Sequence, residues 1–233
     1  MIHVEKFLDE VRRNKQTSLI VLACSGRKRE DLEIEQMLPR NLQKLEEEAV
    51  LFDESVSRLL EDFRRCTMVM HGNAVEKSKE YPAYLRYSGS FYNSVWDNGG
   101  FDVWEKVIKD MWKVLILSAY YGFLKITDPI SDYNLQISRL NAGCKQVLPK
   151  VLDSIIKTNG VEKVYLLTSK EYSKPFKNKL DNLYRVVLLD RSDMEIRGAY
   201  GTEYYSEAGK LFTSLVTSRH IPGKTNSIEL EEI

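Results

Sequence analysis

Four short apolar runs, separated by segments long enough to hold helices, constrain the fold of this 233-residue chain more than any other feature. The runs cover 18–23, 114–117, 162–168 and 184–190 and are rich in Val, Leu and Ile, which is typical of strands covered on both faces. Connections that can hold a helix favour parallel pairing of such strands. We therefore predict an α/β fold: a single domain with a central, mostly parallel or mixed sheet flanked by helices.

Helices are predicted where apolar residues recur at intervals of three and four. Such segments cover 3–14, 41–65, 101–112, 145–158, 170–182 and 203–218. The stretch 71–90 contains Gly72, Pro82 and Gly89 and is predicted to be mostly loop.

Gly and Pro are scattered along the chain and do not concentrate in one segment, so the sequence shows no linker between domains. One domain is therefore expected over residues 1–220. The last segment, 221–233, contains Pro222-Gly223 and a run of Glu, and we expect it to form a flexible C-terminal tail.

The balance of charge gives the chain no overall attraction to nucleic acid or to an anionic membrane, because 34 basic residues match 34 acidic ones. No apolar run approaches the ~18 residues of a membrane-spanning helix, and the charged segment 1–16 does not resemble a signal peptide. Cys24, Cys66 and Cys144 are odd in number and far apart, which is typical of reduced thiols. These features predict a cytoplasmic protein that has no membrane partner.

Polar residues follow all four predicted strands. The strand ends are Cys24-Ser25-Gly26-Arg27-Lys28, Ser118, Thr168-Ser169-Lys170 and Asp190-Arg191. Because the carboxyl ends of parallel strands meet at one edge of a sheet, these residues should gather where open α/β sheets bind ligands. Their backbone N–H groups could bind phosphate or carboxylate, with added positive charge from Arg27, Lys28, Lys170 and Arg191. The alternative is that each Ser or Thr only caps the helix that follows it.

The segment 113–135 leaves the second strand and is dense in Tyr, Gly, Asp and Pro. It brings aromatic rings and carboxylates to the same edge of the sheet, from Tyr120, Tyr121, Asp128, Asp132 and Tyr133. Asp128, held by the following Pro129, is predicted to lie opposite Lys28. Such a pair could bind phosphate through the Lys or transfer protons. The alternatives are a loop that packs on its own sheet and an ordinary surface ion pair.

Familiar catalytic and metal-binding motifs are absent from the sequence. There is no GxGxxG, GxxxxGKS/T or GxSxG, and His3, His71 and His220 do not pair at metal-ligand spacing. We therefore expect no metal and no cofactor. His71 could be a general base, or a satisfied histidine of the surface or core. Cys24 stands before two cations, which can activate a thiol, or it closes the strand as a small buried residue.

Four segments of the chain together resemble a known family. They are ACSGRK at 23–28, LRYSGSFYNSV at 85–95, VLILSAYYGFLKITDPISDYNL at 114–135 and LLTSKEYSKPF at 166–176. In this order, and over about residues 18–218, they resemble the motifs of the YaaA family of peroxide-stress proteins. The second motif is carried by Tyr87, Ser88, Gly89 and Tyr92. The third is carried by Ser118, Tyr121, Gly122, Leu124, Asp128, Pro129, Ile130, Tyr133 and Leu135, and the fourth by Ser169, Glu171 and Tyr172.

The resemblance implies a single α/β domain whose cleft is lined by these motifs. It also implies a role in the oxidative-stress response, in which the protein limits DNA damage or free iron. Together with the strand ends it gives the expected ligand-binding set: Ser25, Arg27, Lys28, Tyr87, Ser88, Gly89, Tyr92, Ser118, Tyr121, Gly122, Asp128, Tyr133 and Ser169. If the protein is an enzyme, Lys28, Cys24 and Asp128 are the candidates for the chemistry.

The chain departs from the family at several basic positions. Lys125-Ile126 stands where the family has Arg-Pro, Asn134 stands for an Arg, and Ser206-Glu207 replaces a basic pair, with Lys210 nearby. Because nonspecific DNA affinity comes largely from phosphate contacts, these changes weaken the DNA hypothesis. A cleft with Tyr rings and few cations would suit a nucleotide, a nucleobase, or single-stranded or duplex DNA.

Two hypotheses remain open. The chain is either a nucleotide- or nucleic-acid-binding stress protein without turnover, or an enzyme that acts on a nucleobase or nucleotide. Direct iron binding has no ligand cluster in its favour.

Overall fold

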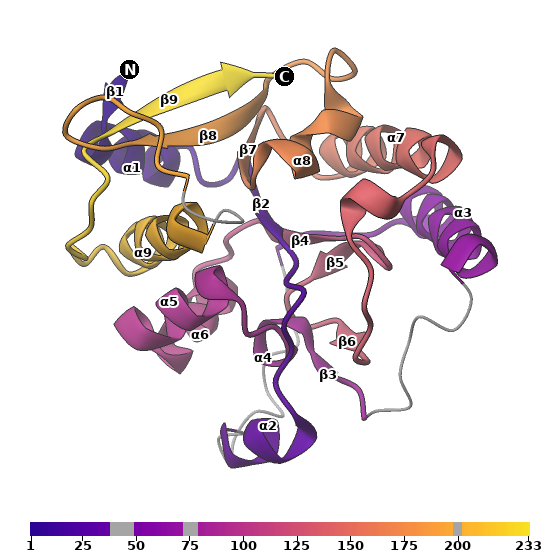
Figure 1. Cartoon of the computed structure of the whole chain (residues 1–233). Coiled ribbons are helices and arrows are strands. Elements are labelled where there is room, and N and C mark those ends of the chain that lie inside the picture. The colour runs from indigo at the N-terminus through magenta and orange to yellow at the C-terminus, as the bar shows by residue number, and fades with distance from the viewer. Residues whose placement is uncertain (38–48, 72–78, 198–201) are drawn as a thin grey trace.

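The computed structural model describes residues 1–37, 49–71, 79–197 and 202–233. Within these residues the centre of the fold is a seven-stranded sheet in the order β1-β9-β8-β7-β2-β4-β5 (Figure 1). A two-stranded sheet of β3 and β6 lies apart from it.

The four predicted strands form the parallel centre of the main sheet. They are β2 (Ser18–Ala23), β4 (Val114–Ser118), β7 (Lys163–Leu167) and β8 (Leu183–Leu189). β2 pairs in parallel with both β4 and β7, and β7 pairs in parallel with β8. The predicted α/β fold with a mixed sheet is confirmed.

Further strands that were not predicted complete the sheets. Antiparallel partners in the main sheet are β1 (Ile2–His3), β5 (Gly122–Lys125) and β9 (Ser227–Glu232), and the small sheet holds β3 (Tyr81–Pro82) and β6 (Pro129–Ile130). Most of them have only two to four residues, too few to give a clear pattern in the sequence.

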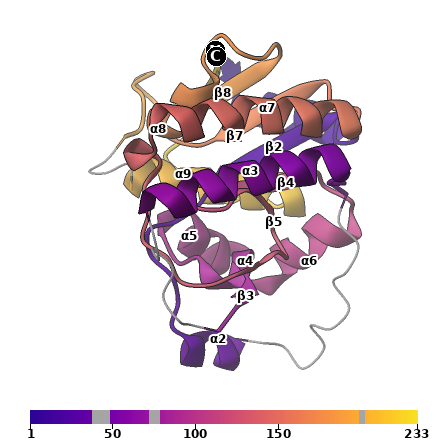
Figure 2. The same cartoon turned by 90° about the vertical axis from the view of Figure 1, so that its right-hand side faces the viewer.

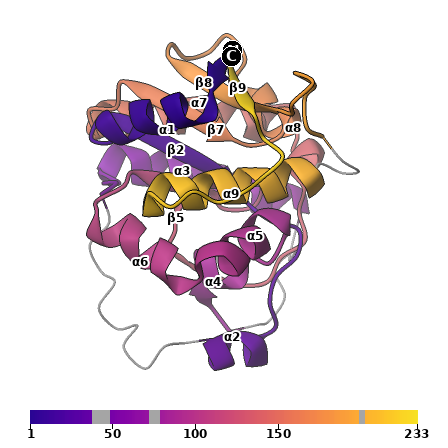
Figure 3. The same ribbon diagram turned by 90° about the vertical axis from the view of Figure 1, so that its left-hand side faces the viewer.

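Helices cover both faces of the main sheet. α3 (Glu54–His71) and α7 (Ala142–Thr158) lie side by side on one face (Figure 2). α1 (Val4–Arg13) and α9 (Thr202–Thr217) lie on the other, where α5 (Ser90–Gly99) and α6 (Phe101–Lys109) also pack against α9 (Figure 3). The short elements are α2 (Asp31–Met37), α4 (Ala83–Arg86), η2 (Ile137–Arg139), α8 (Lys170–Ser173) and η3 (Lys174–Phe176). In the described ranges, none of the helices combines the length and the apolar character needed to cross a bilayer.

The helix predicted over 41–65 begins later than expected. Residues 38–48 lie outside the described residues, and 49–53 are not helical. Asp53 Oδ1 accepts a hydrogen bond from the Val56 N–H at 2.8 Å and so caps the start of α3.

Two other predicted segments differ in extent. The helix predicted over 170–182 ends at Phe176, and Asn178 and Asn182 adopt left-handed conformations (φ 55° and 56°) that no helix continues through. The stretch 71–90 contains β3, α4 and the first residue of α5. The prediction that it is mostly loop was therefore wrong for the residues that are described.

Residues 221–233 do not form the expected flexible tail, because β9 lies between β1 and β8 within the sheet. Ile228 is fully buried while the next residue, Glu229, is exposed. The Glu-rich composition hid a strand whose first two residues are buried, whereas Glu229 and Glu232 are exposed.

Glu207 of α9 fixes the chain that leads into β9. Its Oε2 accepts hydrogen bonds from the backbone N–H groups of Lys224 at 2.6 Å and Thr225 at 3.2 Å. Its Oε1 contacts Lys210 Nζ at 2.8 Å. Glu207 therefore has a structural role.

Cys66 and Cys144 form a disulfide, so the prediction of three reduced thiols was wrong. The two residues are 78 positions apart in the sequence, but α3 and α7 are neighbours and bring their Cα atoms to 5.7 Å. Sequence spacing cannot reveal such a pairing, because it depends on which helices become neighbours. Cys24 is a free thiol.

Substitution of Ile228 tests whether β9 belongs to the folded core. Ile228→Ala should lower the free energy of unfolding by about 2–4 kcal/mol, because it leaves a cavity under the sheet. Glu229→Ala is the matched control and should change it by less than about 0.5 kcal/mol, since the side chain is exposed. Equal, small effects in urea denaturation would mean that the C-terminal segment does not pair with β8.

Candidate ligand site at the carboxyl edge of the sheet

The strand order creates a topological switch point between β2 and β7. From β2 the chain passes to β4 on one side, and it later enters β7 on the other side of β2. Doubly wound sheets bind their ligands in the crevice that opens at the carboxyl ends of two such strands. The residues at this point are Cys24-Ser25 after β2 and Thr168-Ser169 after β7.

Two tyrosines border the switch point. Cys24 Sγ lies 3.1 Å from the hydroxyl of Tyr172 in α8, and the Ser169 N–H donates to the hydroxyl of Tyr205 in α9 at 3.2 Å. Burial raises the pKa of Tyr172 and that of Tyr205, so both hydroxyls remain protonated at neutral pH. Cys24, Ser169 and both tyrosines are half-buried, which leaves this edge partly open to solvent.

The loop after β2 packs against the start of α5. Lys28 and Tyr87 form a β-bridge, and the Ser88 N–H donates to the Arg27 carbonyl at 3.1 Å. These backbone contacts hold the loop in register with the segment that leads into α5.

Gly89 caps α5 where this helix meets the loop. A Cβ at Gly89 would lie 2.3 Å from Ser25 Oγ, so a larger residue here would require the Ser25 side chain to move. The first backbone N–H groups of α5 have no acceptor within the helix. Together with the exposed Arg27 they can receive an anion at this end of the helix.

A buried hydroxyl network supports the site from below. The Tyr133 hydroxyl lies 2.6 Å from that of Tyr87 and 2.8 Å from Ser118 Oγ. Ser118 Oγ also accepts the N–H groups of Tyr120 and Tyr121 at 3.2 and 3.0 Å. Burial raises the pKa of Tyr87 and of Tyr133 well above the usual value. The network ties β4 and two loops into one unit.

The tyrosine rings of this network pack against one another. The Tyr87 and Tyr92 ring centroids are 5.1 Å apart, and Tyr121 meets Tyr133 edge-on at 5.4 Å. Tyr87, Tyr92 and Tyr133 are almost completely buried. Their rings therefore belong to the core and are not open stacking surfaces for a base.

Lys28 contacts a different carboxylate from the one predicted. Its side chain is 2% exposed, and its ammonium lies 3.9 Å from Asp132. The ammonium also donates a hydrogen bond to the backbone carbonyl of Tyr133 and lies 3.8 Å from the centre of the Tyr133 ring. Asp128 Oδ2 instead accepts the Lys125 N–H at 2.8 Å. The structure does not support the predicted Lys28–Asp128 pair.

Gly122 and Asp128 belong to the turns on either side of β5. Gly122 has φ 79°, and a Cβ there would lie 3.0 Å from the Phe63 ring. β5 runs back from the carboxyl edge, so that Lys125 pairs with Leu115 near the start of β4. Asp128 therefore follows the far end of β5, where burial raises the pKa of its carboxyl group.

All predicted residues except Asp128 gather at the carboxyl edge, Gly122 among them because it pairs with Ser118 at the end of β4. The others contribute to the loop contacts, the buried network or the switch point and are Cys24, Ser25, Arg27, Lys28, Tyr87, Ser88, Gly89, Tyr92, Ser118, Tyr121, Tyr133 and Ser169. The expected ligand-binding set omitted Tyr172, Tyr205 and Asp132, although Asp132 was expected at this edge of the sheet. Tyr172 belongs to the same motif as Ser169, so the sequence could have indicated that it lies at the site. Tyr205 belongs to none of the four motifs, so nothing in the sequence pointed to it.

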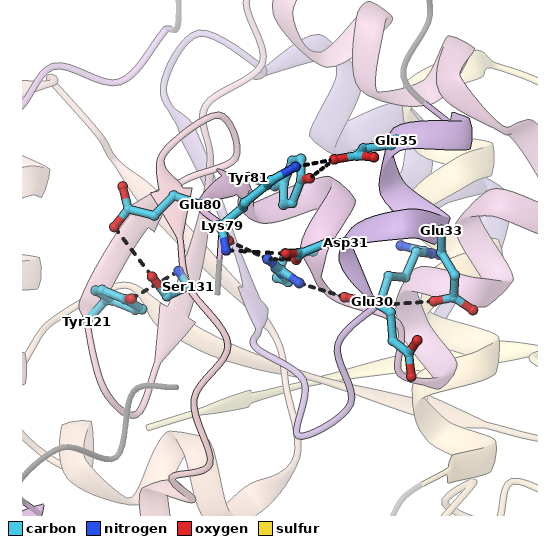
Figure 4. A network of polar contacts seen from close by, with 11 residues as sticks. Glu30, Asp31, Glu33, Glu35, Lys79, Glu80, Tyr81, Tyr121 and Ser131 are labelled. Atoms are coloured by element: carbon cyan, nitrogen blue, oxygen red, sulfur yellow. Dashed lines mark hydrogen bonds and ion pairs between the residues drawn. The ribbon is translucent and has the colours of Figure 1, made fainter. Parts of the chain in front are cut away.

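A second polar network anchors the far end of the loop that follows β2 (Figure 4). The Arg86 side chain is 2% exposed and donates to Asp31 Oδ1 at 2.8 Å. This hydrogen bond holds the pKa of Asp31 below its usual value. Lys79 and Tyr81 contact Glu35 at 2.6 and 3.1 Å, so that α2 is held both at its first residue and near its middle. Arg86 immediately precedes Tyr87, and the two networks thus hold the same segment.

No model of a known protein family matches the sequence, and no curated protein sequence matches it significantly. Among the residues that the structure describes, no group of three or more His, Cys, Asp and Glu side chains is placed to hold a metal ion.

Removal of one hydroxyl tests the buried network. Tyr133→Phe should lower the free energy of unfolding by about 1–3 kcal/mol, because Ser118 and Tyr87 each lose a buried partner. Tyr84→Phe is the matched control: the buried Tyr84 hydroxyl has no hydrogen-bond partner within the described residues, so its removal should be neutral or stabilising. Equal destabilisation of the two variants in urea would contradict the network.

Proposed function

We propose that this protein binds a nucleotide or a short nucleic-acid strand at the switch point between β2 and β7, as a YaaA-like protein of the oxidative-stress response. The observation that carries the proposal is the coincidence of an anion-receiving helix end with a topological switch point. Ser25, exposed Arg27 and the start of α5 meet there beside Cys24 and Ser169.

The phosphate of such a ligand would lie near Arg27 and the first N–H groups of α5. Its base would lie toward the half-buried Tyr172 and Tyr205, whose protonated hydroxyls can donate hydrogen bonds. The stackable rings expected from the sequence are mostly buried, so hydroxyl and backbone contacts would supply the specificity. This favours a nucleotide or the end of a single strand over duplex DNA.

The stress role rests on the resemblance of the four motifs. It would involve limiting DNA damage or free iron, and binding of a nucleotide or of damaged single strands is compatible with the first of these. Lys28 supports this site indirectly, because its ammonium is engaged by Tyr133 and Asp132.

An enzyme acting on a nucleobase or nucleotide is the second candidate. The observation in its favour is the thiol of Cys24, which lies 3.1 Å from the Tyr172 hydroxyl at the switch point. In this candidate the Cys24 thiolate would be the nucleophile, and the Tyr172 hydroxyl would stabilise it by donating a hydrogen bond. Asp128 does not take part in this candidate, because it caps a distant turn.

Calorimetric titration with ribonucleoside 5′-monophosphates, and with the matching nucleosides, tests the proposal. The monophosphates should bind more tightly than the nucleosides, and Arg27→Gln should weaken their binding about tenfold through loss of a charge-assisted contact. Arg65→Gln is the matched control, since its side chain is 74% exposed on α3, away from the switch point. Absence of binding, or an equal loss in both variants, would refute the proposed site.

A further inference from the structure

A cavity of about 790 Å³ opens between α7 and the segments η2, α8 and η3. Apolar residues line much of it: Ile137, Ala142, Pro149, Pro175 and Leu180. Ile137 and Pro149 are buried and therefore form a floor, not an exposed rim. The volume falls in the range of small-molecule sites, which are concave and mostly apolar with a few polar groups.

This cavity is separate from the switch point. α8 lies between the two, with Tyr172 directed toward Cys24, while Glu171 and Lys174 line the cavity. None of the residues assigned above to the ligand site at the carboxyl edge lines it.

The charged groups of the cavity are mainly positive. Four lysines line it, Lys145, Lys150, Lys174 and Lys179, against two acids, Asp153 and Glu171. Both acids already have cationic partners, since Asp153 contacts Lys157 at 2.6 Å and Glu171 contacts Lys174. In a chain without net charge, this lining is a local excess of positive charge.

Two of the lysines are available to a ligand. Lys145 donates to the Ser138 carbonyl at 3.1 Å and thereby closes one wall. Lys150 and Lys179 have exposed side chains, and neither ammonium group makes a hydrogen bond or an ion pair within the part of the chain that the structure describes. One is on α7 and the other follows η3, so they approach the cavity from opposite walls.

Pro149 lies inside α7 and has no N–H to donate to the Lys145 carbonyl one turn earlier. Both residues line the cavity.

We propose that the cavity is a second binding site, specific for a small amphipathic organic anion. The apolar body of the ligand lies over Ile137, Pro149 and Leu180, and its carboxylate, sulfonate or phosphate lies between Lys150 and Lys179. The apolar floor distinguishes this ligand from a free inorganic ion, and the lysines distinguish it from a neutral apolar molecule.

Fluorescence titration with 8-anilinonaphthalene-1-sulfonate tests this proposal, because this probe is an aromatic sulfonate. It should bind saturably to the folded protein at a single site. Lys150→Gln and Lys179→Gln should each weaken binding about tenfold, and added salt should weaken it further. Lys109→Gln on α6, with a side chain 63% exposed and outside the cavity, should leave the affinity unchanged.

Two comparisons make the test specific. The neutral analogue N-phenyl-1-naphthylamine should bind more weakly than the sulfonate, and an excess of a nucleoside monophosphate should not displace the sulfonate. The proposal is overturned by an affinity that neither lysine variant changes, by equal binding of the neutral analogue, by displacement with nucleotide, or by absence of saturable binding. Unfolding midpoints of the variants should match that of the parent protein, which separates loss of the site from loss of the fold.

Discussion

The contact on which the carboxyl edge of the sheet depends is the buried hydroxyl cluster of Ser118, Tyr87 and Tyr133. These residues come from the end of β4 and from two loops. Lys28, in the loop after β2, places its ammonium over the ring of Tyr133. Since a buried hydroxyl without a partner costs free energy, these hydrogen bonds favour the arrangement in which the three segments meet. The cluster thereby fixes the loops that lie under the switch point between β2 and β7, where Cys24 and Ser169 are half-buried.

The same constraint explains why the chain carries so many tyrosines near strand ends. A tyrosine fills core volume with its ring and also supplies a hydroxyl to satisfy buried polar groups. Tyr92 illustrates both uses, because its ring packs on Tyr87 while its hydroxyl donates to the Ala23 carbonyl at 2.9 Å. Two interpretations of the Tyr-rich loop were open: that it packs on its own sheet, or that it offers rings for stacking. Tyr133 fits the first of these.

The sequence predicted the four central strands because continuous apolar runs report burial on both faces directly. It did not predict β9, because half of that strand faces solvent and its Glu residues suggested a tail. The disulfide of Cys66 and Cys144 and the Lys28–Asp132 contact depend on which distant segments meet, and no local pattern encodes that. Strand ends and motifs nevertheless located most of the residues at the carboxyl edge. The prediction for Asp128 was wrong, because the hairpin of β4 and β5 places this residue at the opposite edge of the sheet.

Alkylation of Cys24 tests the central claim, that the ligand binds at the switch point between β2 and β7. Cys24 is a half-buried free thiol at that point, so its rate of reaction with N-ethylmaleimide reports whether the crevice is occupied. At a nucleoside monophosphate concentration of about ten times Kd, the rate measured by mass spectrometry should fall about tenfold. An unchanged rate at saturating nucleotide would contradict the account, because a ligand bound elsewhere would leave the thiol accessible.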